Sequence, residues 1–496
     1  MTEIESTNEE ANPRRVALGR LRERGINPFP PDYRRSHTCA AAAALADAPT
    51  HVTVAGRMGI LREMGRIAFA HLTDETGRVQ LLLRKDAVGE AGWALLRDLH
   101  AGDVVGAEGE TMRSRPGEPS VAATSLTLLS KALQPPPEKF HGLKDVELRH
   151  RHRYLDLLAN ERARSTFRTR SRIVSSVRRF LDERGFLEVE TPVLQPLYGG
   201  ASARPFETFH NDMEQRLYLR ISDELYLKRL IVGGFDKVYE IGHDFRNESI
   251  SFKHNPEFTM LELYVAYADY HDVMALCESL VATTVAEITG GSVVDFQGQR
   301  IDFKPPWRRL SMRQALVDAV GLDFTQHREV TSLADACRKL GLRGGEVGSW
   351  GKIVDELVKN YVEPVLVQPT FLMDYPRELS PLAKRHRTDP LLVERFEPYA
   401  AGFEIGNAFS ELNDPDDQRE RFLDQRRAAA EGDEEAHQLD EEYLFALQHG
   451  MPPTGGLGLG IDRLTMLLTD HRSIREVILF PHMRSSDTGG NAACSP

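Results

Sequence analysis

The sequence predicts an α+β protein of several domains, in which a small β-barrel precedes a larger mixed domain. Its 496 residues exceed one ordinary domain, for which ~100–200 residues are typical. Alternating apolar residues between positions 51 and 129 predict short strands, whereas helical and strand-like spacings mix after position 166. Pro135–Pro137 can continue neither a strand ladder nor a helix, so a domain boundary falls there.

Composition excludes several classes of protein. Hydrophobic residues make up 41% and charged residues 27%, which is typical of globular chains rather than disordered ones. No apolar run approaches the ~18 residues that cross a bilayer, and the acidic first ten residues lack the apolar stretch of a secretory signal. Cys39, Cys277, Cys337 and Cys494 show no C-x-x-C spacing, so we expect reduced thiols, the cytosol and no membrane.

The first domains follow from local patterns. Residues 1–50 form an N-terminal helical extension, because the arginine-rich segment Arg14–Arg24 predicts a short helix. Residues 51–134 predict three strands, a helix and two strands, with a turn at Asp74–Gly77. The expected strands lie around residues 52–54, 67–69, 79–83, 104–112 and 121–129, and the helix spans residues 88–99. This succession suits a five-stranded OB barrel, a common oligonucleotide platform, although another small barrel fits the spacing as well.

Residues 135–165 form a basic linker between the two parts. From Lys139 to Arg179 there are twelve Lys or Arg residues against four Asp or Glu residues, although the whole chain carries a formal net charge of −12. A solvated helix surface and a track for a polyanion between two domains explain this stretch equally well. Apolar residues at helical spacing between Phe167 and Leu181 then predict a helix.

Two segments place polar groups on one face of a predicted sheet. In YEIGHDFRNE, residues 239–248, Arg246 points away from the apolar side of the strand. In FTMLELY, residues 258–264, an apolar face suited to covering helices alternates with a polar one. The polar face carries Phe258, Met260, Glu262 and Tyr264. Such a face would pack poorly in a hydrophobic core and therefore indicates a binding site. A sheet face exposed to solvent is the alternative.

The segment RFEPYAAGFEIGNAFSEL, residues 395–412, predicts a hairpin that carries carboxylates. A two-residue loop at Ala400-Ala401 would place Glu397 directly opposite Glu404. Like charges opposed in a ladder are destabilising, but Mg²⁺ would bridge them, since hard carboxylate oxygens suit this ion. A hairpin in another register with solvated glutamates is the alternative.

Two further features follow in the chain. Asn407 and Glu411 would share a face if a turn of helix begins between them. In GGLGLGIDRLTMLL, residues 455–468, the glycines allow close backbone approach, and Arg463 lies off the apolar stripe of the helix that follows. Neither a dinucleotide fingerprint nor a P-loop motif is present in the sequence.

These segments together resemble one family closely. YEIGHDFRNESISFKHNPEFTMLELY is similar to the second signature motif of class II aminoacyl-tRNA synthetases, and GLGLGIDR is similar to the third. GFLEVETPVL, which ends near Pro192, resembles the first motif, the dimer interface of the family. GGASARPF, DELYLKRL, HNPEFTM and EIGNAFSELND resemble the bacterial lysine-specific enzymes of subclass IIb. The resemblance covers about residues 50–483.

The resemblance implies a function and a fold for the second domain. It implies ATP-dependent activation of L-lysine to lysyl-adenylate and transfer of the lysyl group to the 3′ end of tRNA(Lys), with Mg²⁺ as cofactor. It also implies a homodimer in the cytoplasm. Residues 166–496 would form the class II catalytic domain, an antiparallel sheet flanked by helices, with a mainly helical insertion around residues 305–385.

The resemblance also implies roles for single residues. Arg246 would contact the substrate carboxylate and the α-phosphate, and Arg463 would lie over adenine and reach the γ-phosphate, so these two are the expected catalytic residues. The expected ATP-binding residues are Arg246, Glu248, His254, Asn255, Phe258 and Arg463. The expected lysine-binding residues are Gly200, Glu224, Glu262, Tyr264, Asn407 and Glu411. Glu397 and Glu404 would hold Mg²⁺.

One face of the predicted barrel offers a site for a nucleobase. With the predicted turn, Gln80 falls opposite His71 and diagonal to Phe69. An exposed aromatic ring stacks on an unpaired base, and an amide reads the edge of that base. Phe69 as part of the barrel core is the alternative. The resemblance adds Arg57 and Glu118 as neighbours at the central anticodon base.

Three other functions compete with this interpretation. A sibling enzyme for aspartate or asparagine would need a cation where Glu262 and Glu411 stand. A non-catalytic tRNA-binding regulatory paralogue should have lost Arg246, Arg463 or the two metal-binding glutamates, and all four are present. Enzymes of this kind that attach lysine to a protein lack the N-terminal OB domain.

Overall fold

The computed structural model describes residues 12–137, 143–344, 348–430 and 438–484. These residues divide into two compact units. The first holds the described residues up to Asp145 together with 154–159, and the second holds residues 146–153 and 160–484. Cys494, the first ten residues and part of the predicted linker lie outside the described residues. Among the helices of the described residues, none is both long and apolar enough to cross a membrane.

The N-terminal segment of the first unit packs on its barrel. Helix α1 (Pro13–Glu23) confirms the predicted helix, and Asn12 caps it by accepting a hydrogen bond from the Arg14 amide. The alanine run forms α2 (Cys39–Ala44). Leu21 of α1 and Cys39 of α2 are both fully buried in the core of the barrel.

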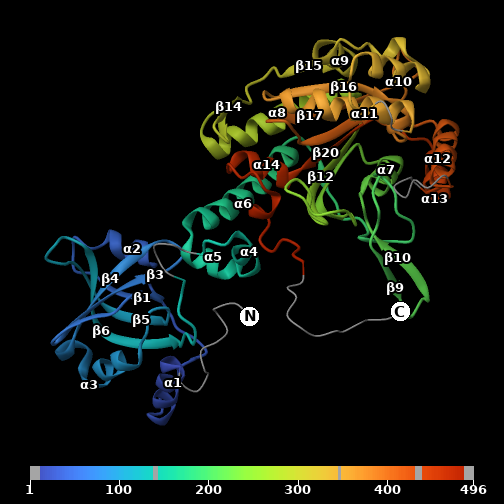
Figure 1. Ribbon diagram of the computed structural model, residues 1–496. Helices are drawn as coiled ribbons and strands as arrows, with labels where there is room; N and C mark the ends of the chain where they lie inside the picture. The colour runs from blue at the N-terminus through green and yellow to red at the C-terminus, as the bar shows by residue number, and fades with distance from the viewer. Residues whose placement is uncertain (1–11, 138–142, 345–347, 431–437, 485–496) are drawn as a thin grey trace. The chain divides into compact units, whose positions relative to one another are not determined.

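The first unit is a closed OB barrel, as predicted (Figure 1). Its strands are β1 (His51–Met58), β3 (Ile67–Thr73), β4 (Arg78–Arg84), β5 (Val104–Arg113) and β6 (Pro119–Ser130). They follow the order β1-β5-β6-β4-β3, and β3 pairs with β1 to close the barrel. The short β2 (Arg62–Met64), which the sequence did not predict, extends the β3 edge. Between β4 and β5 lie α3 (Lys85–Leu95) and η2 (Leu96–Asp98).

The second unit is built on a mainly antiparallel sheet of nine strands. In sheet order the strands are β15 (Arg308–Ser311), β16 (Thr370–Pro376), β17 (Leu392–Ala400), β19 (Gly406–Ser410), β20 (Thr454–Gly460), β12 (Glu257–Ala266), β11 (Lys237–Phe245) and β7 (Leu187–Glu188), with β18 (Phe403–Glu404) on β17. Only the outer pairs, β15–β16 and β7–β11, are parallel.

Helices cover one face of this sheet (Figure 1). Helices α6 (Glu161–Asp182), α8 (Tyr270–Thr289) and α14 (Ile461–Leu468) share a buried apolar core with the strands. Leu261 and Leu263 of β12 belong to this core and are fully buried. The predicted apolar face of FTMLELY is therefore confirmed, and the polar face is left for the opposite side of the sheet.

The remaining elements surround the sheet. The helices are α4 (Val146–Arg151), α5 (Arg153–Ala159), α7 (Glu224–Val232), α9 (Met312–Val320), α10 (Val330–Lys339), α11 (Trp350–Tyr361), α12 (Pro415–Ala430) and α13 (Glu441–Gln448). The 3₁₀ turns are η3 (Phe324–Gln326), η4 (Glu363–Val365), η5 (Arg377–Leu379) and η6 (Ile474–Glu476). The minor strands are β8 (Leu194–Gln195), β9 (Glu207–His210), β10 (Gln215–Leu219), β13 (Val293–Phe296) and β14 (Gln299–Asp302). Within the predicted insertion, α9–α11 lie between β15 and β16, which both belong to the main sheet.

Several arginines of the basic stretch are used inside the second unit. Arg153 is fully buried and donates hydrogen bonds to the carbonyls of Arg475 and Leu479. Arg149 forms an ion pair of 3.0 Å with Glu476. These guanidinium groups stabilise the fold of this unit, so they are neither solvated surface nor free sites for a polyanion.

Candidate active site

Every ATP-, lysine- and metal-binding residue that the sequence predicts in the second unit lines one cavity of about 470 Å³. These residues are Gly200, Glu224, Arg246, Glu248, His254, Asn255, Phe258, Glu262, Tyr264, Glu397, Glu404, Asn407, Glu411 and Arg463. They come from distant parts of the chain and meet on the sheet face that the helices leave open.

Glycines of β20 make room for the carboxylates beside them. Gly456 pairs with Tyr264, and Gly458 pairs with Glu262. A Cβ atom added at Gly456 would lie 2.6 Å from Cε1 of Tyr264 and would overlap the Glu411 carboxylate, and one at Gly458 would lie 2.5 Å from Oε1 of Glu262. The sequence predicted a close approach at these glycines. In the structure, the side chains of Tyr264, Glu262 and Glu411 lie close to the β20 backbone at the cavity wall.

The predicted register of the carboxylate hairpin is wrong. The two-residue loop is Ala401-Gly402, so Glu404 pairs with Tyr399 rather than with Glu397. Both loop residues have positive φ, 56° and 73°, which a two-residue turn of the I′ type requires and which glycine favours. The pairing shifts by two residues, and a shift by an even number leaves Glu397 and Glu404 on the same face as diagonal neighbours.

Buried hydrogen bonds hold the carboxylate of Glu397. It accepts hydrogen bonds from Tyr375 at 2.7 Å and Tyr399 at 2.8 Å, and Arg395 lies 2.7 Å away. Burial, and then the negative charge of Glu404, raise the pKa of Glu397 to about 7. Two carboxylates that repel each other in this way fit a hard divalent cation.

Asn407 and Glu411 share a face because the chain is extended from one to the other, not because a helix begins there. Asn407 lies in β19, and Glu411 follows the last residue of that strand. Arg395 donates a hydrogen bond of 2.8 Å to Oδ1 of Asn407 and so connects it to Glu397. The predicted shared face is confirmed, and the predicted turn of helix is wrong.

Glu224, Glu262 and Glu411 form a buried carboxylate group in the cavity. Burial raises the pKa of each, and the pKa of Glu262 is raised further by Glu224. Tyr264 donates a hydrogen bond of 3.2 Å to Glu262. The ammonium of Lys228, fully buried, pairs with both Glu224 and Glu411. One cation therefore faces three carboxylates in this group, and the group carries an excess of about two negative charges when all three ionise.

One oxygen of this group has no partner. Lys228 pairs with Oε2 of Glu411, whereas Oε1 of Glu411 finds no hydrogen-bond partner among the described residues although it is buried. A buried carboxylate oxygen without a donor is costly, and a ligand ammonium would satisfy it. Gly200, with a φ of +88°, packs its backbone against Ser222 and Glu224 at the same group.

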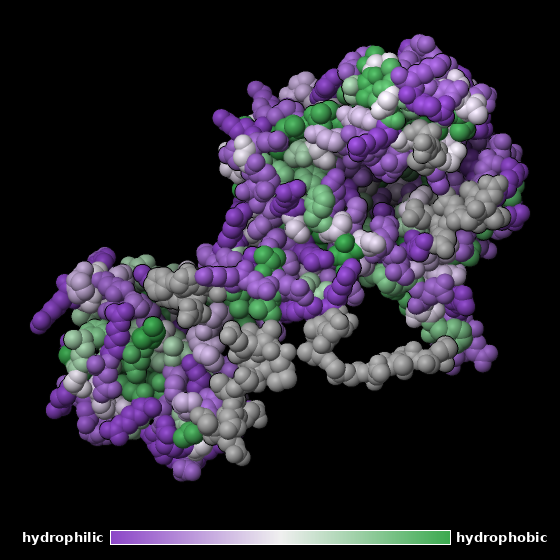
Figure 2. Space-filling model, in the orientation of Figure 1, coloured by the Kyte–Doolittle hydropathy of each residue, from purple (hydrophilic) through white to green (hydrophobic). Residues whose placement is uncertain are grey.

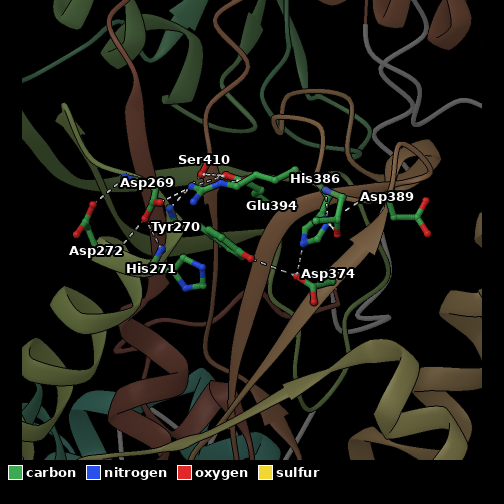
Figure 3. A network of polar contacts seen from close by, with 11 residues as sticks. Asp269, Tyr270, His271, Asp272, Asp374, His386, Asp389, Glu394 and Ser410 are labelled. Atoms are coloured by element: carbon green, nitrogen blue, oxygen red, sulfur yellow. Dashed lines mark hydrogen bonds and ion pairs between the residues drawn. The ribbon is translucent and has the colours of Figure 1, made fainter.

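A polar network fixes the strand that carries Glu411 (Figure 3). Ser410, the residue before it, donates a hydrogen bond of 2.7 Å to the buried Glu394. Arg387 pairs with Glu394 at 2.5 Å and also with Asp269 at the N-terminus of α8. β19 is thereby tied to the covering helix next to the cavity.

The predicted ATP-binding residues form another part of the cavity wall. The guanidinium carbon of Arg246 lies 5.0 Å from the centre of the Phe258 ring. Arg463 donates hydrogen bonds to the carbonyl of Glu404 at 2.7 Å and to its carboxylate at 3.0 Å. Burial lowers the pKa of Arg463, but Glu404 and Glu397 outweigh burial and raise it, so this side chain stays a cation.

The other nucleotide residues lie nearby. Burial, and then Arg463, lower the pKa of His254, whose Nδ1 lies 2.9 Å from the Ser251 hydroxyl. Asn255 is nearly buried and donates to the carbonyl of Glu257 at 2.6 Å. Glu248 is exposed at the cavity rim, with its amide bonded to the carbonyl of Arg246 at 2.8 Å.

Two residues of the site were missed in the sequence. Lys228 stands four residues after Glu224 on α7, so the helical spacing in DELYLKRL signals that pair. Arg395 stands two residues before Glu397 on β17, so the two side chains share a face. The pairing of Lys228 with Glu411 joins segments far apart in the chain and has no local signal.

The residues predicted to contact a nucleobase share one face of the barrel in the first unit. His71 pairs with Gln80, and Arg57 pairs with Thr73, so these residues share a face with Phe69. Glu118 accepts hydrogen bonds from Gln80 and pairs with His71, each at 2.7 Å.

Phe69 is not part of the barrel core. Ala68, Ala70 and Leu72 are buried in that core, whereas Phe69 alternates with them and is only half-buried. The core alternative for Phe69 is therefore excluded.

Comparisons with known proteins identify the family of the chain. A family model described as "tRNA synthetases class II (D, K and N)" matches residues 145–484, and one described as "OB-fold nucleic acid binding domain" matches residues 52–129. The lysine--tRNA ligase of Roseiflexus castenholzii is 56% identical over 96% of this chain and 99% of its own. Those of Chloroflexus aurantiacus and Carboxydothermus hydrogenoformans are 54% and 49% identical, over 95% and 98% of this chain and 97% and 100% of their own.

Proposed function

Because the chain belongs to the class II tRNA synthetases of the D, K and N group, we propose that its cavity is where L-lysine reacts with ATP. The protein is a lysine--tRNA ligase: it activates lysine as lysyl-adenylate and transfers the lysyl group to tRNA(Lys). In the first step the lysine carboxylate attacks the α-phosphorus of ATP and pyrophosphate leaves. In the second, the terminal ribose of the tRNA takes the lysyl group and AMP leaves.

The excess of buried carboxylates carries the proposal of a lysine pocket. Of the buried carboxylates Glu224, Glu262 and Glu411, the ammonium of Lys228 pairs with Glu224 and Glu411 only, and L-lysine brings two more ammonium groups. An aspartate side chain would meet this group as a like charge, and asparagine would leave its charge uncompensated. Both sibling activities are therefore disfavoured by the same observation.

We assign the two ends of the substrate to different carboxylates. Glu224 and the Gly200 backbone bind the α-ammonium, Glu411 and Tyr264 bind the ε-ammonium beside Glu262, and Asn407 meets the carboxylate. The test is aminoacylation of tRNA(Lys) transcripts with labelled lysine, compared with aspartate and asparagine on their own tRNAs. Lysylation alone supports the proposal, and charging with aspartate or asparagine alone overturns it.

We further propose that two arginines stabilise the charge that develops in the first step. Arg246 would bridge the substrate carboxylate and the α-phosphate, and Arg463 would lie over adenine and bind the γ-phosphate, with Phe258 on the other face of the base. Glu248, His254 and Asn255 would complete the nucleotide site. Catalysis then consists of positioning and electrostatic stabilisation, without a protein nucleophile.

Glu397 and Glu404 are the residues that would hold Mg²⁺. They share a strand face, line the same cavity, and the charge of Glu404 raises the pKa of Glu397. When bound, the ion neutralises phosphate charge and orients the leaving group.

We expect Glu404→Gln to raise the Mg²⁺ concentration for half-maximal pyrophosphate exchange by about tenfold, the effect of a lost contact of ~1.4 kcal/mol. The measurement is a Mg²⁺ titration at saturating ATP and lysine. Glu257→Gln, an exposed glutamate on β12, is the control. An unchanged Mg²⁺ requirement would remove Glu404 from the metal site.

We propose that the barrel face of the first unit binds the anticodon, with Arg57, Phe69, Gln80 and Glu118 at the central base. Base stacking on an aromatic ring contributes ~1–3 kcal/mol, so we expect Phe69→Ala to impair tRNA charging by about 10- to 100-fold. Pyrophosphate exchange should stay nearly unchanged, because that reaction takes place in the other unit. Phe29→Ala, an exposed phenylalanine of the same unit, is the control. Loss of both activities together with a lower Tm would contradict the recognition role.

We also propose a homodimer that forms through the region near Pro192. Large apolar side chains are exposed there and on the β9–β10 hairpin, where Figure 2 shows a small hydrophobic area. They are Leu187, Val193, Leu194, Leu197, Phe209 and Met213. Light scattering should give about twice the chain mass of 55.8 kDa, and the mass of a single chain would contradict the dimer.

We propose a cytoplasmic location for the protein, because its role is to charge tRNA.

A further inference from the structure

Lys228 occupies an unusual place behind the carboxylates of the cavity. Its side chain has no solvent exposure, and it does not itself line the cavity, whereas Glu224 and Glu411 both do. The ammonium pairs with Oε1 of Glu224 and with Oε2 of Glu411. One buried cation therefore joins the carboxylate assigned to the α-ammonium of the substrate to the one assigned to its ε-ammonium.

The surroundings of Lys228 keep it charged. Burial lowers its pKa, but Glu224 and Glu411 outweigh burial and raise it. Aromatic rings complete the site, since Nζ lies 5.3 Å from the centre of the Phe409 ring and 6.0 Å from that of Tyr264. These groups enclose the ammonium, and its side chain has no solvent exposure.

This geometry leaves one oxygen of Glu411 for a second cation. Lys228 takes one oxygen of Glu411, and the other oxygen, Oε1, is buried without a hydrogen-bond partner among the described residues. Gly456 makes room for this oxygen, since a Cβ atom at that position would overlap it. This buried oxygen belongs to a residue that lines the cavity and lacks a hydrogen-bond donor, which a ligand ammonium would supply.

We propose that Lys228 is a positioning residue for lysine binding, which holds one oxygen of Glu224 and one of Glu411 and leaves the other oxygen of each for the substrate. This proposal rests on the proposed lysine pocket. It couples the two ends of the substrate, because any change at Lys228 disturbs both carboxylates at once. Its positive charge also opposes the effect of burial on the pKa of Glu224 and Glu411, and so favours their ionised forms.

The test compares two variants of the full-length enzyme in pyrophosphate exchange. Lys228→Met keeps the length of the side chain and removes the charge, and we expect the KM for lysine to rise by about 10- to 100-fold. The KM for ATP and kcat at saturating lysine should change less than about threefold. Lys237→Met, an exposed lysine on β11, is the matched control and should change nothing.

The pH dependence adds a readout that a purely structural role would not affect. Without the ammonium, the pKa values of Glu224 and Glu411 rise further, so the KM for lysine in Lys228→Met should fall steeply as the pH is raised from 6 to 9. Three other residues interact electrostatically with the group formed by Lys228, Glu224 and Glu411, and they stay unchanged in the variant. They are Tyr443 of α13, Glu262 of β12 and Arg395 of β17.

Lys228→Arg keeps the charge and provides the second test of the proposal if Lys228→Met does not fold. A guanidinium binds a carboxylate with two parallel hydrogen bonds and so occupies the oxygen reserved for the substrate. We expect its KM for lysine to rise about three- to tenfold with little change in Tm. An unchanged KM for lysine in a folded variant overturns the role of Lys228, whereas a wild type that does not activate lysine overturns the lysine pocket itself.

Discussion

Glu411→Gln should reduce kcat/KM for lysine in pyrophosphate exchange by about 10²–10³-fold. Removal of one member of a buried charge pair costs roughly 3–5 kcal/mol, and each 1.4 kcal/mol is a factor of ten. The fold should survive, because Lys228 keeps its pairing with Glu224 in this variant. The KM for ATP should change far less, since the nucleotide residues belong to another part of the wall.

The control for this variant is Glu442→Gln, an exposed glutamate on α13. It removes the same charge from the same unit outside the cavity and should leave lysine activation unchanged. The pH adds a second check: burial raises the pKa of Glu411, so the wild-type KM for lysine should increase as the pH falls and Glu411 takes up a proton. A Glu411→Gln variant with the wild-type KM for lysine would exclude Glu411 from the pocket.

Arg246→Lys should lower kcat of pyrophosphate exchange by about 10²–10³-fold, the effect of one lost donor in a preorganised site. The substitution keeps the positive charge but removes the planar fork that contacts two anionic groups at once. The guanidinium also packs over Phe258 at 5.0 Å, a contact that a lysine ammonium does not reproduce in the same geometry. Measurement of kcat at saturating lysine and ATP separates this loss from weaker binding.

Arg338→Lys, an exposed arginine on α10, is the matched control and should behave as the wild type. If Arg246→Lys keeps kcat within about threefold, then a positive charge alone suffices at this position. The bridging role of the guanidinium would then be wrong, although the lysine pocket would be unaffected.

The faces of the strands could be predicted from the sequence because alternation is local. Phe258, Glu262 and Tyr264 were placed on one face of β12 from their spacing, and the structure confirms that all three line the cavity. The register of β3 with β4 followed from the turn, so that His71 and Gln80 pair as expected. In both cases, the sequence pattern that sets the face or the register lies within the strands themselves or in the turn between them.

The hairpin register was mispredicted because the sequence AAG allows two different two-residue loops, Ala400-Ala401 and Ala401-Gly402. The structure selects Ala401-Gly402, where glycine takes one of two positive φ angles. Lys228 was missed for a different reason. Its pairing with Glu224 is local on α7, but its pairing with Glu411 arises only when β19 is assembled beside that helix.

The most direct test of the lysine pocket is ATP–pyrophosphate exchange with each of the twenty amino acids. This reaction needs the cavity but no tRNA, so the choice of amino acid is measured without any contribution from tRNA recognition. We predict that lysine supports exchange and that aspartate and asparagine do not. Exchange with aspartate or asparagine in the absence of exchange with lysine would contradict the assignment of Glu224, Glu262 and Glu411 to a lysine pocket.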